Sequence, residues 1–216
     1  MDEPRPDAAP ARSRVFPALA AVVALGLATA FFLSDLPARW RAPAAPSVFH
    51  GRDIGSENWN AAFALSDMAG RSRTLDEFRG KIVLIAFGYT HCPDVCPTTL
   101  AKFAEVRRLL GADGGRVQAL FVTIDPERDT AELLRAYVPA FDPSFIGLRG
   151  TEVQTDAITR ALHANYQIVD NHGEILVDHT ASTYILDARG RPRVVTPYDQ
   201  PAGVLAEDVR ALLREG

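Results

Sequence analysis

Cysteine is nearly absent from this chain of 216 residues: it occurs only twice, at Cys92 and Cys96. With no other thiol for either residue to pair with, this Cys-x-x-x-Cys pair is a structural disulfide, a redox couple or a clamp for a soft metal. A structural disulfide is the least favoured of these, because closing so short a loop gains little chain entropy. The pair therefore predicts redox chemistry or metal binding.

An excess of basic charge is also missing. The chain has 23 Lys and Arg against 27 Asp and Glu, for a formal net charge of −4 at pH 7. Nucleic acids are bound by basic surfaces, so this composition argues against a nucleic-acid partner. The sequence has no internal repeat, and its apolar fraction of 47% is ample for a core. We expect one domain of ordinary size with extra segments.

Charge is absent from one long apolar stretch, residues 15–33. As a helix it would span about 28 Å, close to the hydrocarbon thickness of a bilayer. Three arginines precede it and two follow it, which favours a cytoplasmic N-terminus. We expect residues 1–14 to be cytoplasmic and residues 15–33 to be a single-pass anchor in the inner (plasma) membrane. The rest is then exported to the periplasm or its equivalent. A signal peptide cleaved after Ala30 is the alternative.

Residues 34–60 are rich in Pro and Ala, which predicts a tether between the anchor and a folded domain of residues 61–216. Strand and helix patterns alternate in that domain. The expected elements are a hairpin (61–65 and 71–75), a buried strand (81–88), a helix (98–110), a strand (117–124), a helix from an Asp129 N-cap to Tyr137, a strand (145–148), a helix from a capping box at Thr151 to Ala164, a hairpin (166–169 and 174–177), two strands (183–186 and 193–195) and a final helix (203–213).

This order predicts an α/β fold of the thioredoxin-like type, with a central mixed sheet flanked by helices. An N-terminal β-hairpin and an inserted hairpin are added to it, and one transmembrane helix precedes it. The cysteines lie between the buried strand and the next helix, with Pro97 expected as the first helical residue. Backbone N–H groups and the helix dipole stabilise a thiolate there, so we expect reactive thiols and not buried ones.

Two features depart from thioredoxin. The cysteine spacing is one residue longer than Cys-x-x-Cys. A proline is also missing before the strand that should face the cysteines, and the segment 176–183 carries His179 instead.

The run from Phe87 to Leu100, FGYTHCPDVCPTTL, resembles the signature of the SCO/SenC family. Further similarities follow in the same order, namely DPERDT at 125–130, FIGL at 145–148 and VDHT at 177–180. The resemblance covers about residues 60–214. It implies a membrane-anchored, thioredoxin-like copper protein that assists assembly of the binuclear copper site of cytochrome c oxidase. By the same resemblance, Cys92, Cys96 and His179 bind one copper ion, and the partners are the copper-bearing oxidase subunit and a copper donor protein.

The chemistry of these residues agrees with that implication. Cu(I) prefers thiolates, and imidazole suits both Cu(I) and Cu(II). Three ligands would also leave a position open for exchange with a partner, which a closed four-ligand zinc site resists.

An alternative function is a thiol–disulfide oxidoreductase, in which Cys92 attacks the oxidase cysteines and Cys96 resolves the mixed disulfide. His179 discriminates between the two functions, because a reductase does not need it. A peroxidase of the peroxiredoxin type is disfavoured, since the Thr-His-Cys run does not match the spacing that it requires.

Other histidines and acidic residues of the chain are not assigned as copper ligands. His91 is expected to support the site and not to be a ligand, because adjacent side chains in extended backbone point to opposite faces. Asp178 either orients the imidazole of His179 or guides copper, or it is an exposed loop acid. Asp125 is expected to turn the chain near the site. The other histidines are expected on the surface: His50, His163 and His172.

Overall fold

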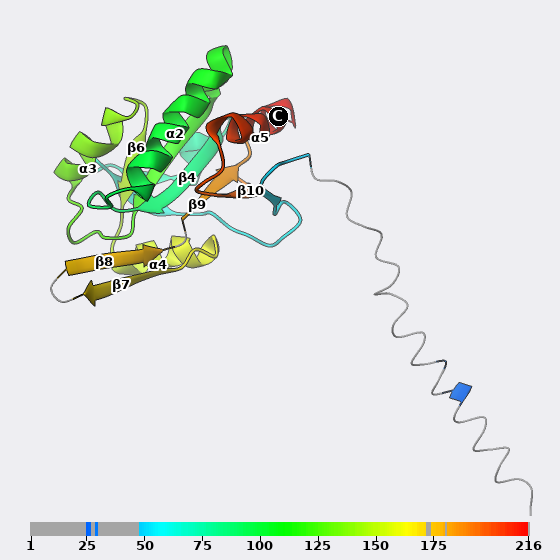
Figure 1. Cartoon of the computed structure of the whole chain (residues 1–216), viewed down its shortest axis with the longest axis horizontal. Coiled ribbons are helices and arrows are strands. Elements are labelled where there is room, and N and C mark those ends of the chain that lie inside the picture. Colours follow the sequence, from blue (N-terminus) through cyan, green and yellow to red (C-terminus); the bar gives the residue numbers. More distant parts are fainter. Residues whose placement is uncertain (1–24, 27–28, 30–47, 172–173, 180, 216) are drawn as a thin grey trace, which may run out of the picture. The chain divides into compact units, whose positions relative to one another are not determined.

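The computed structural model describes residues 25–26, 29, 48–171, 174–179 and 181–215, with the backbone alone for 168–171 and 174–179 (Figure 1). The chain divides into two compact units, Met1–Pro46 and Ser47–Gly216. The segments predicted to be cytoplasmic (1–14) and transmembrane (15–33) fall almost wholly outside the described residues. In the described ranges, no helix has the length and apolar character needed to cross a membrane.

A mixed sheet organises the second unit. Within the described residues it has eight strands, in the order β1-β10-β9-β4-β5-β6-β2-β3. At its centre, β4 runs parallel to β5 and antiparallel to β9, and β5 runs parallel to β6. The strands are β1 (Arg52–Asp53), β2 (Ala64–Asp67), β3 (Ser72–Thr74), β4 (Ile82–Gly88), β5 (Val117–Thr123), β6 (Ile146–Arg149), β9 (Ser182–Leu186) and β10 (Pro192–Pro197).

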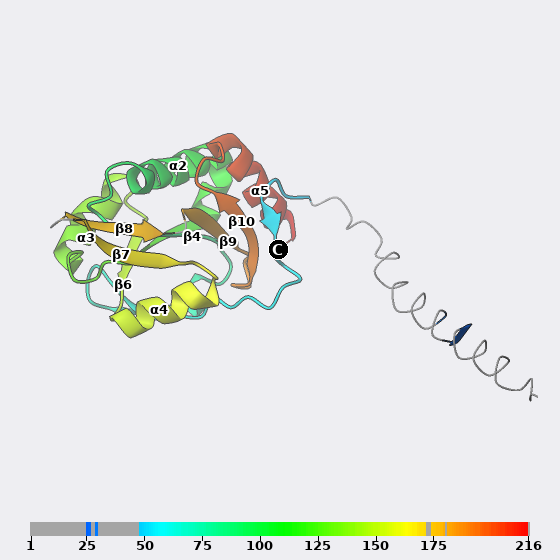
Figure 2. The ribbon, with the colours of Figure 1, turned by 60° about the horizontal axis from the view of Figure 1, so that its bottom comes forward.

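Helices cover both faces of this sheet (Figures 1 and 2). On one face, β4 packs with helices α2 (Val95–Leu110), α3 (Ala131–Tyr137) and α5 (Ala202–Glu215). On the other face, it packs with α4 (Glu152–Ala161) and with a 3₁₀ turn, η1 (Leu75–Phe78). Every residue of β4 and β5 is buried, as expected for parallel strands that are covered on both sides. Two further 3₁₀ segments are η2 (Gly111–Arg116) and η3 (Val138–Ala140).

The inserted hairpin is present as β7 (Tyr166–Asn171) and β8 (Glu174–His179). It forms a two-stranded sheet of its own and, in the described part of the chain, shares no strand pairing with the main sheet. Figures 1 and 2 show it beside α4. The predicted N-terminal hairpin is also confirmed as β2–β3, which joins the main sheet through β6.

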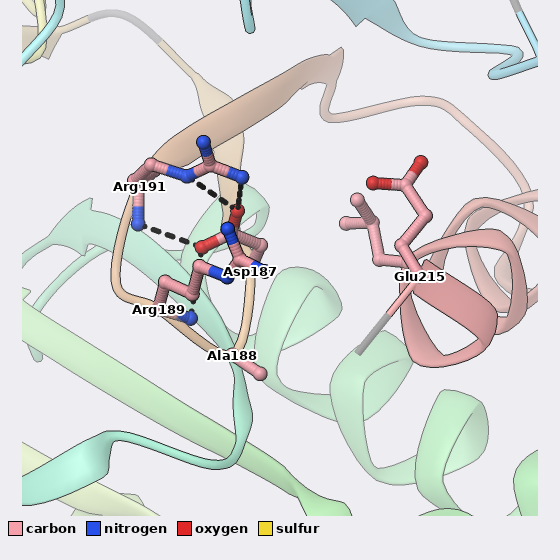
Figure 3. A pocket seen from close by; sticks show the side chains of 6 residues that line it. Asp187, Ala188, Arg189, Arg191 and Glu215 are labelled. Atoms are coloured by element: carbon pink, nitrogen blue, oxygen red, sulfur yellow. Dashed lines mark hydrogen bonds and ion pairs between the residues drawn. The ribbon is translucent and has the colours of Figure 1, made fainter.

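Two turns of the main sheet share one design, Asp-x-x-Gly-Arg. Asp187 follows β9 and accepts hydrogen bonds from the backbone N–H groups of Arg189 and Arg191, both at 2.9 Å, and from the Arg191 guanidinium (Figure 3). Asp67 plays the same part before β3, with Ala69 and Arg71 as donors. The glycines of the two turns have φ of +76° and +78°, a backbone conformation that glycine adopts without strain.

The folded unit begins earlier than residue 61, the boundary expected from the sequence. Phe49 and Ile54 are buried at 7% and 0% exposure, and β1 pairs with β10. The carboxylate of Asp208 on α5 holds this segment by accepting hydrogen bonds from the backbone N–H groups of His50 and Gly51. A strand of two residues has no periodic sequence pattern, which explains why the sequence predicted a tether through residue 60.

Two predicted helix starts also differ. Helix α2 begins at Val95, so Cys96 lies in its first turn and Pro97 is its third residue. Helix α3 is capped by Thr130, whose hydroxyl accepts a hydrogen bond from Leu133 N, and not by Asp129. The capping box of α4, formed by Thr151 and Gln154, is confirmed.

Candidate metal centre

The two cysteines lie where β4 leaves the sheet and α2 begins. Cys92 is half-buried in the connecting loop, and Cys96 is buried, with 2% of its surface exposed. Neither forms a disulfide. Cys92 packs against the core cluster that contains Cys96, and its thiol is close enough to influence the pKa of Cys96. The fold therefore brings both predicted sulfur ligands to one place.

Burial raises the pKa of the Cys96 thiol far above its ordinary value. A hydrogen bond from the Tyr89 backbone acts in the opposite direction, while the neighbouring Cys92 thiol raises this pKa further. The expectation of two reactive, exposed thiolates is therefore wrong for Cys96. Its position in the first turn of α2 places the sulfur in the core, where the charged form is disfavoured.

Gly88, the last residue of β4, makes room for the Cys96 sulfur. A Cβ atom at this position would lie 2.5 Å from Cys96 Sγ and 2.8 Å from Phe121 Cε2. The sulfur thus packs directly against the strand end. The Phe121 ring also lies 6.0 Å from the ring of Tyr137, between centroids.

Tyr137 on α3 is a neighbour of the site that the sequence did not suggest. Its hydroxyl is buried and has no hydrogen-bond partner among the described residues. Burial raises the pKa of Tyr137, and the nearby Cys96, Cys92 and Asp129 raise it further. No sequence pattern singles out this tyrosine from other apolar positions of α3.

Asp129 anchors the cysteine loop through hydrogen bonds to its carboxylate. Its carboxylate is fully buried and accepts hydrogen bonds from Thr90 N at 3.1 Å, Thr90 Oγ1 at 2.5 Å and Thr123 Oγ1 at 2.6 Å. These bonds join the loop after β4, the end of β5 and the segment before α3. Because one side chain accepts all of these bonds, Asp129 fixes the backbone that leads to Cys92.

His91 and Asp125 both lie next to the cysteine loop. His91 is exposed, and its Nδ1 lies 3.2 Å from Thr90 Oγ1 and 3.8 Å from Asp129 Oδ1. Asp125 accepts a hydrogen bond from the guanidinium of Arg128, which lies 5.7 Å above the Tyr89 ring. Asp125 thus orders the chain beside the cysteine loop.

His179 is the last residue of β8, and its backbone pairs with Tyr166 of β7. The side chains of His179 and of its neighbour Asp178 lie outside the described residues. Within the residues that the structure describes, no three His, Cys, Asp or Glu side chains are grouped to hold a metal ion. The assignment of His179 as third ligand therefore stays a prediction.

The remaining histidines are engaged elsewhere. His50 Nε2 lies 2.8 Å from Glu207 Oε2 on α5. His163 follows α4, with its ring centroid 4.5 Å from that of Trp59. Both are exposed, as predicted; His172 lies outside the described residues.

Comparison with known proteins decides the family, because residues 52–214 match SCO1/SenC. The chain belongs to the SCO1/SenC family. It is 42% identical over 132 residues to the mitochondrial SCO2 homolog of Bos taurus. The aligned region covers 59% of this chain and 50% of that protein. The chain thus spans about half of the length of that relative.

Solved structures support the same assignment. ScoI of Bradyrhizobium japonicum, solved with copper bound, is 36% identical, with a TM-score of 0.64 over 70% of this chain and 97% of that one. Apo Sco1 of Thermus thermophilus is also 36% identical, with a TM-score of 0.69 over 78% and 99% of the two chains. The thioredoxin-like arrangement of sheet and helices predicted from the sequence is therefore confirmed.

Proposed function

We propose that this protein is a copper metallochaperone that helps to assemble the binuclear copper site of cytochrome c oxidase. In this role it binds one copper ion through Cys92, Cys96 and His179 and passes the ion to the oxidase. The observation that carries the proposal is the proximity of two free thiols, packed in one core cluster at the junction of β4 and α2. A relative with 36% identity, ScoI of Bradyrhizobium japonicum, has been solved with copper bound.

The donor set suits copper as cargo. Two thiolates and one neutral imidazole carry a charge of −2, so the loaded site has a charge of −1 with Cu(I) and zero with Cu(II). Both oxidation states are thus acceptable, and three ligands leave one position open for a partner. Because burial keeps Cys96 protonated in the metal-free protein, loading must release that proton, which makes affinity depend on pH.

The residues around the two cysteines hold the thiols in place before copper binds. Asp129 holds the loop that carries Cys92, and Gly88 allows the Cys96 sulfur to sit against the strand end. The thiols are therefore placed before metal arrives, which lowers the cost of ordering them on binding.

The location that we propose follows from the N-terminal segment. Residues 15–33 anchor the protein in the inner (plasma) membrane, and the folded unit works on the exported side, beside the oxidase subunit and a copper donor. The apolar stretch and the arginines before it support this proposal. Sequencing the N-terminus of membrane-extracted protein tests it; a mature chain that starts near Phe31 would rule out a retained anchor.

A second function, thiol–disulfide oxidoreductase, has one observation in its favour: Cys92 is more exposed than Cys96. In that reaction the Cys92 thiolate attacks a target disulfide and one target sulfur leaves as a thiol. Cys96 then displaces the second target sulfur. The target gains two thiols, and this protein ends with a Cys92–Cys96 disulfide.

Copper stoichiometry of the reduced full-length chain separates the two functions. The chaperone is expected to hold about one copper per chain, with a Cu(II)–thiolate absorption that weakens or disappears in His179→Ala. The matched control is His163→Ala, which removes an exposed histidine beside Trp59 and should change nothing. Copper binding that is absent, or indifferent to His179, would favour the reductase.

A further inference from the structure

The hairpin β7–β8 needs an anchor, because strand pairing does not provide one. In the described part of the chain, its two strands pair only with each other. An isolated two-stranded hairpin is at best marginally stable in water. Side-chain contacts must therefore fix the position of this hairpin and of His179 at its end.

The base of the hairpin has such a contact. Tyr166, the first residue of β7, is the direct backbone partner of His179. The Tyr166 hydroxyl donates a hydrogen bond of 2.6 Å to Asp156 Oδ1 on α4. The Tyr166 ring also packs against the core cluster that includes Ile158 of α4. Burial, followed by the bond to Asp156, raises the pKa of Tyr166 to about 12.

Helix α4 connects this contact to the main sheet. Its N-terminus is closed by the capping box of Thr151 and Gln154, and Gln154 Nε2 donates to the backbone oxygen of Ala64 in β2 at 2.9 Å. A continuous series of bonded residues thus runs from β2 through α4 to the base of the hairpin.

We propose that Tyr166 and Asp156 are positioning residues for the metal centre, because their hydrogen bond holds on α4 the strand end where His179 lies. The proposal rests on the proposed function, in which His179 is a copper ligand. Tyr166 and Asp156 do not touch the metal. They determine how often the hairpin end is in the place that ligation requires.

The test can remove this bond without leaving a buried charge unpaired. Asp156 is 40% exposed and also lies 3.4 Å from Arg160 Nη2, so it keeps a cationic partner and solvent in Tyr166→Phe. The aromatic ring that packs on the core is retained as well. The variant should therefore fold and lose only the anchor.

The first measurement is hydrogen exchange of the metal-free full-length chain. Loss of one hydrogen bond should make the amides of 166–171 and 174–179 exchange about fivefold faster in Tyr166→Phe, while β4 and α2 exchange as before. Asp156→Ala, which removes the acceptor, should act in the same direction, and the double variant with Tyr166→Phe should add little, because both changes break the same contact. Tyr198→Phe, at an exposed tyrosine after β10, is the matched control and should have no effect. Unchanged exchange of the hairpin in Tyr166→Phe overturns the proposal.

The second measurement is Cu(I) affinity in competition with a chromogenic chelator. Tyr166→Phe should weaken it about fivefold, in line with the exchange, and should weaken it no further when His179→Ala is already present. Faster exchange without loss of affinity, in a protein where His179→Ala does weaken binding, overturns the positioning role and leaves the proposed function intact. If His179→Ala itself has no effect on affinity, the proposed ligand set fails and the positioning role fails with it.

Discussion

The cysteine loop and the β7–β8 hairpin are held in very different ways. The loop joins the buried strand β4 to the helix α2 and is held by hydrogen bonds to the carboxylate of Asp129. The hairpin forms a separate two-stranded sheet whose described base is tied to α4 by Tyr166. In the proposed site, two ligands thus come from a fixed scaffold and the third from a separately anchored element. A protein that must both accept and release a metal benefits from this division, because one ligand can leave without disturbing the core.

We expect the largest loss of Cu(I) affinity from a substitution in the cysteine loop. Cys96→Ser removes a sulfur ligand, and we expect Cu(I) affinity to fall by more than ~100-fold, beyond the loss typical of outer residues of metal sites. His179→Ala should have a smaller effect, since two thiolates remain. Competition with a chromogenic chelator measures both. Equal losses for the two variants would contradict the division between a fixed and a separate ligand.

Asp129→Ala should damage the scaffold itself. It leaves the Thr90 N–H and the hydroxyls of Thr90 and Thr123 without their acceptor, and we expect unfolding free energy to fall by about 3 kcal/mol. Asp129→Asn keeps the shape and one acceptor oxygen, so its loss should be about half as large. Urea unfolding followed by circular dichroism measures both, and a loss below about 1 kcal/mol for Asp129→Ala would show that the loop does not depend on this carboxylate.

Gly88→Ala tests how closely the Cys96 sulfur packs on the strand. The added Cβ would lie 2.5 Å from Cys96 Sγ, and overpacking of this kind should lower the unfolding free energy by about 2 kcal/mol. Gly203→Ala is the matched control, because nothing lies within 4 Å of its added Cβ; it should be neutral or slightly stabilising in α5. Equal stability of the two variants would mean that the thiol has room to move.

Acid should weaken the scaffold through its turns. Burial raises the pKa of Asp67, but hydrogen bonds from the backbone of Arg71 and Ala69 and from the side chains of Arg71 and Arg73 outweigh it and lower the pKa to about 2. A carboxyl whose pKa is lowered on folding contributes stability above its unfolded pKa of about 4, and this is lost as the pH falls towards 2. We expect about 1 to 2 kcal/mol to disappear over that range. Asp67→Asn should remove this part of the pH dependence; an unchanged profile would contradict the assignment.

The sequence predicted most of the scaffold. The apolar runs of β4 and β5, the capping box at Thr151 and the hairpin β2–β3 are local patterns, and each appears in the structure where it was expected. The predicted position of the cysteine pair, after the buried strand β4 and at the start of α2, is also confirmed.

Features that depend on distant partners could not be predicted. Asp129 and Thr130 are both good N-cap residues, and the choice between them is decided by Thr90, 39 residues away from Asp129. The burial of Cys96 depends on α2 starting before Pro97, and the order of residues 49–54 depends on Asp208. No sequence pattern predicts the hydrogen bond between Tyr166 and Asp156.

X-ray absorption at the copper edge tests the central claim most directly, because it counts ligand atoms by element. For the Cu(I)-loaded full-length chain, a site shared by the loop and the hairpin predicts two sulfur neighbours and one imidazole nitrogen, with the nitrogen lost in His179→Ala and kept in His163→Ala. A spectrum with two sulfurs and no imidazole, or one that is unchanged by His179→Ala, would contradict the claim that the hairpin supplies the third ligand.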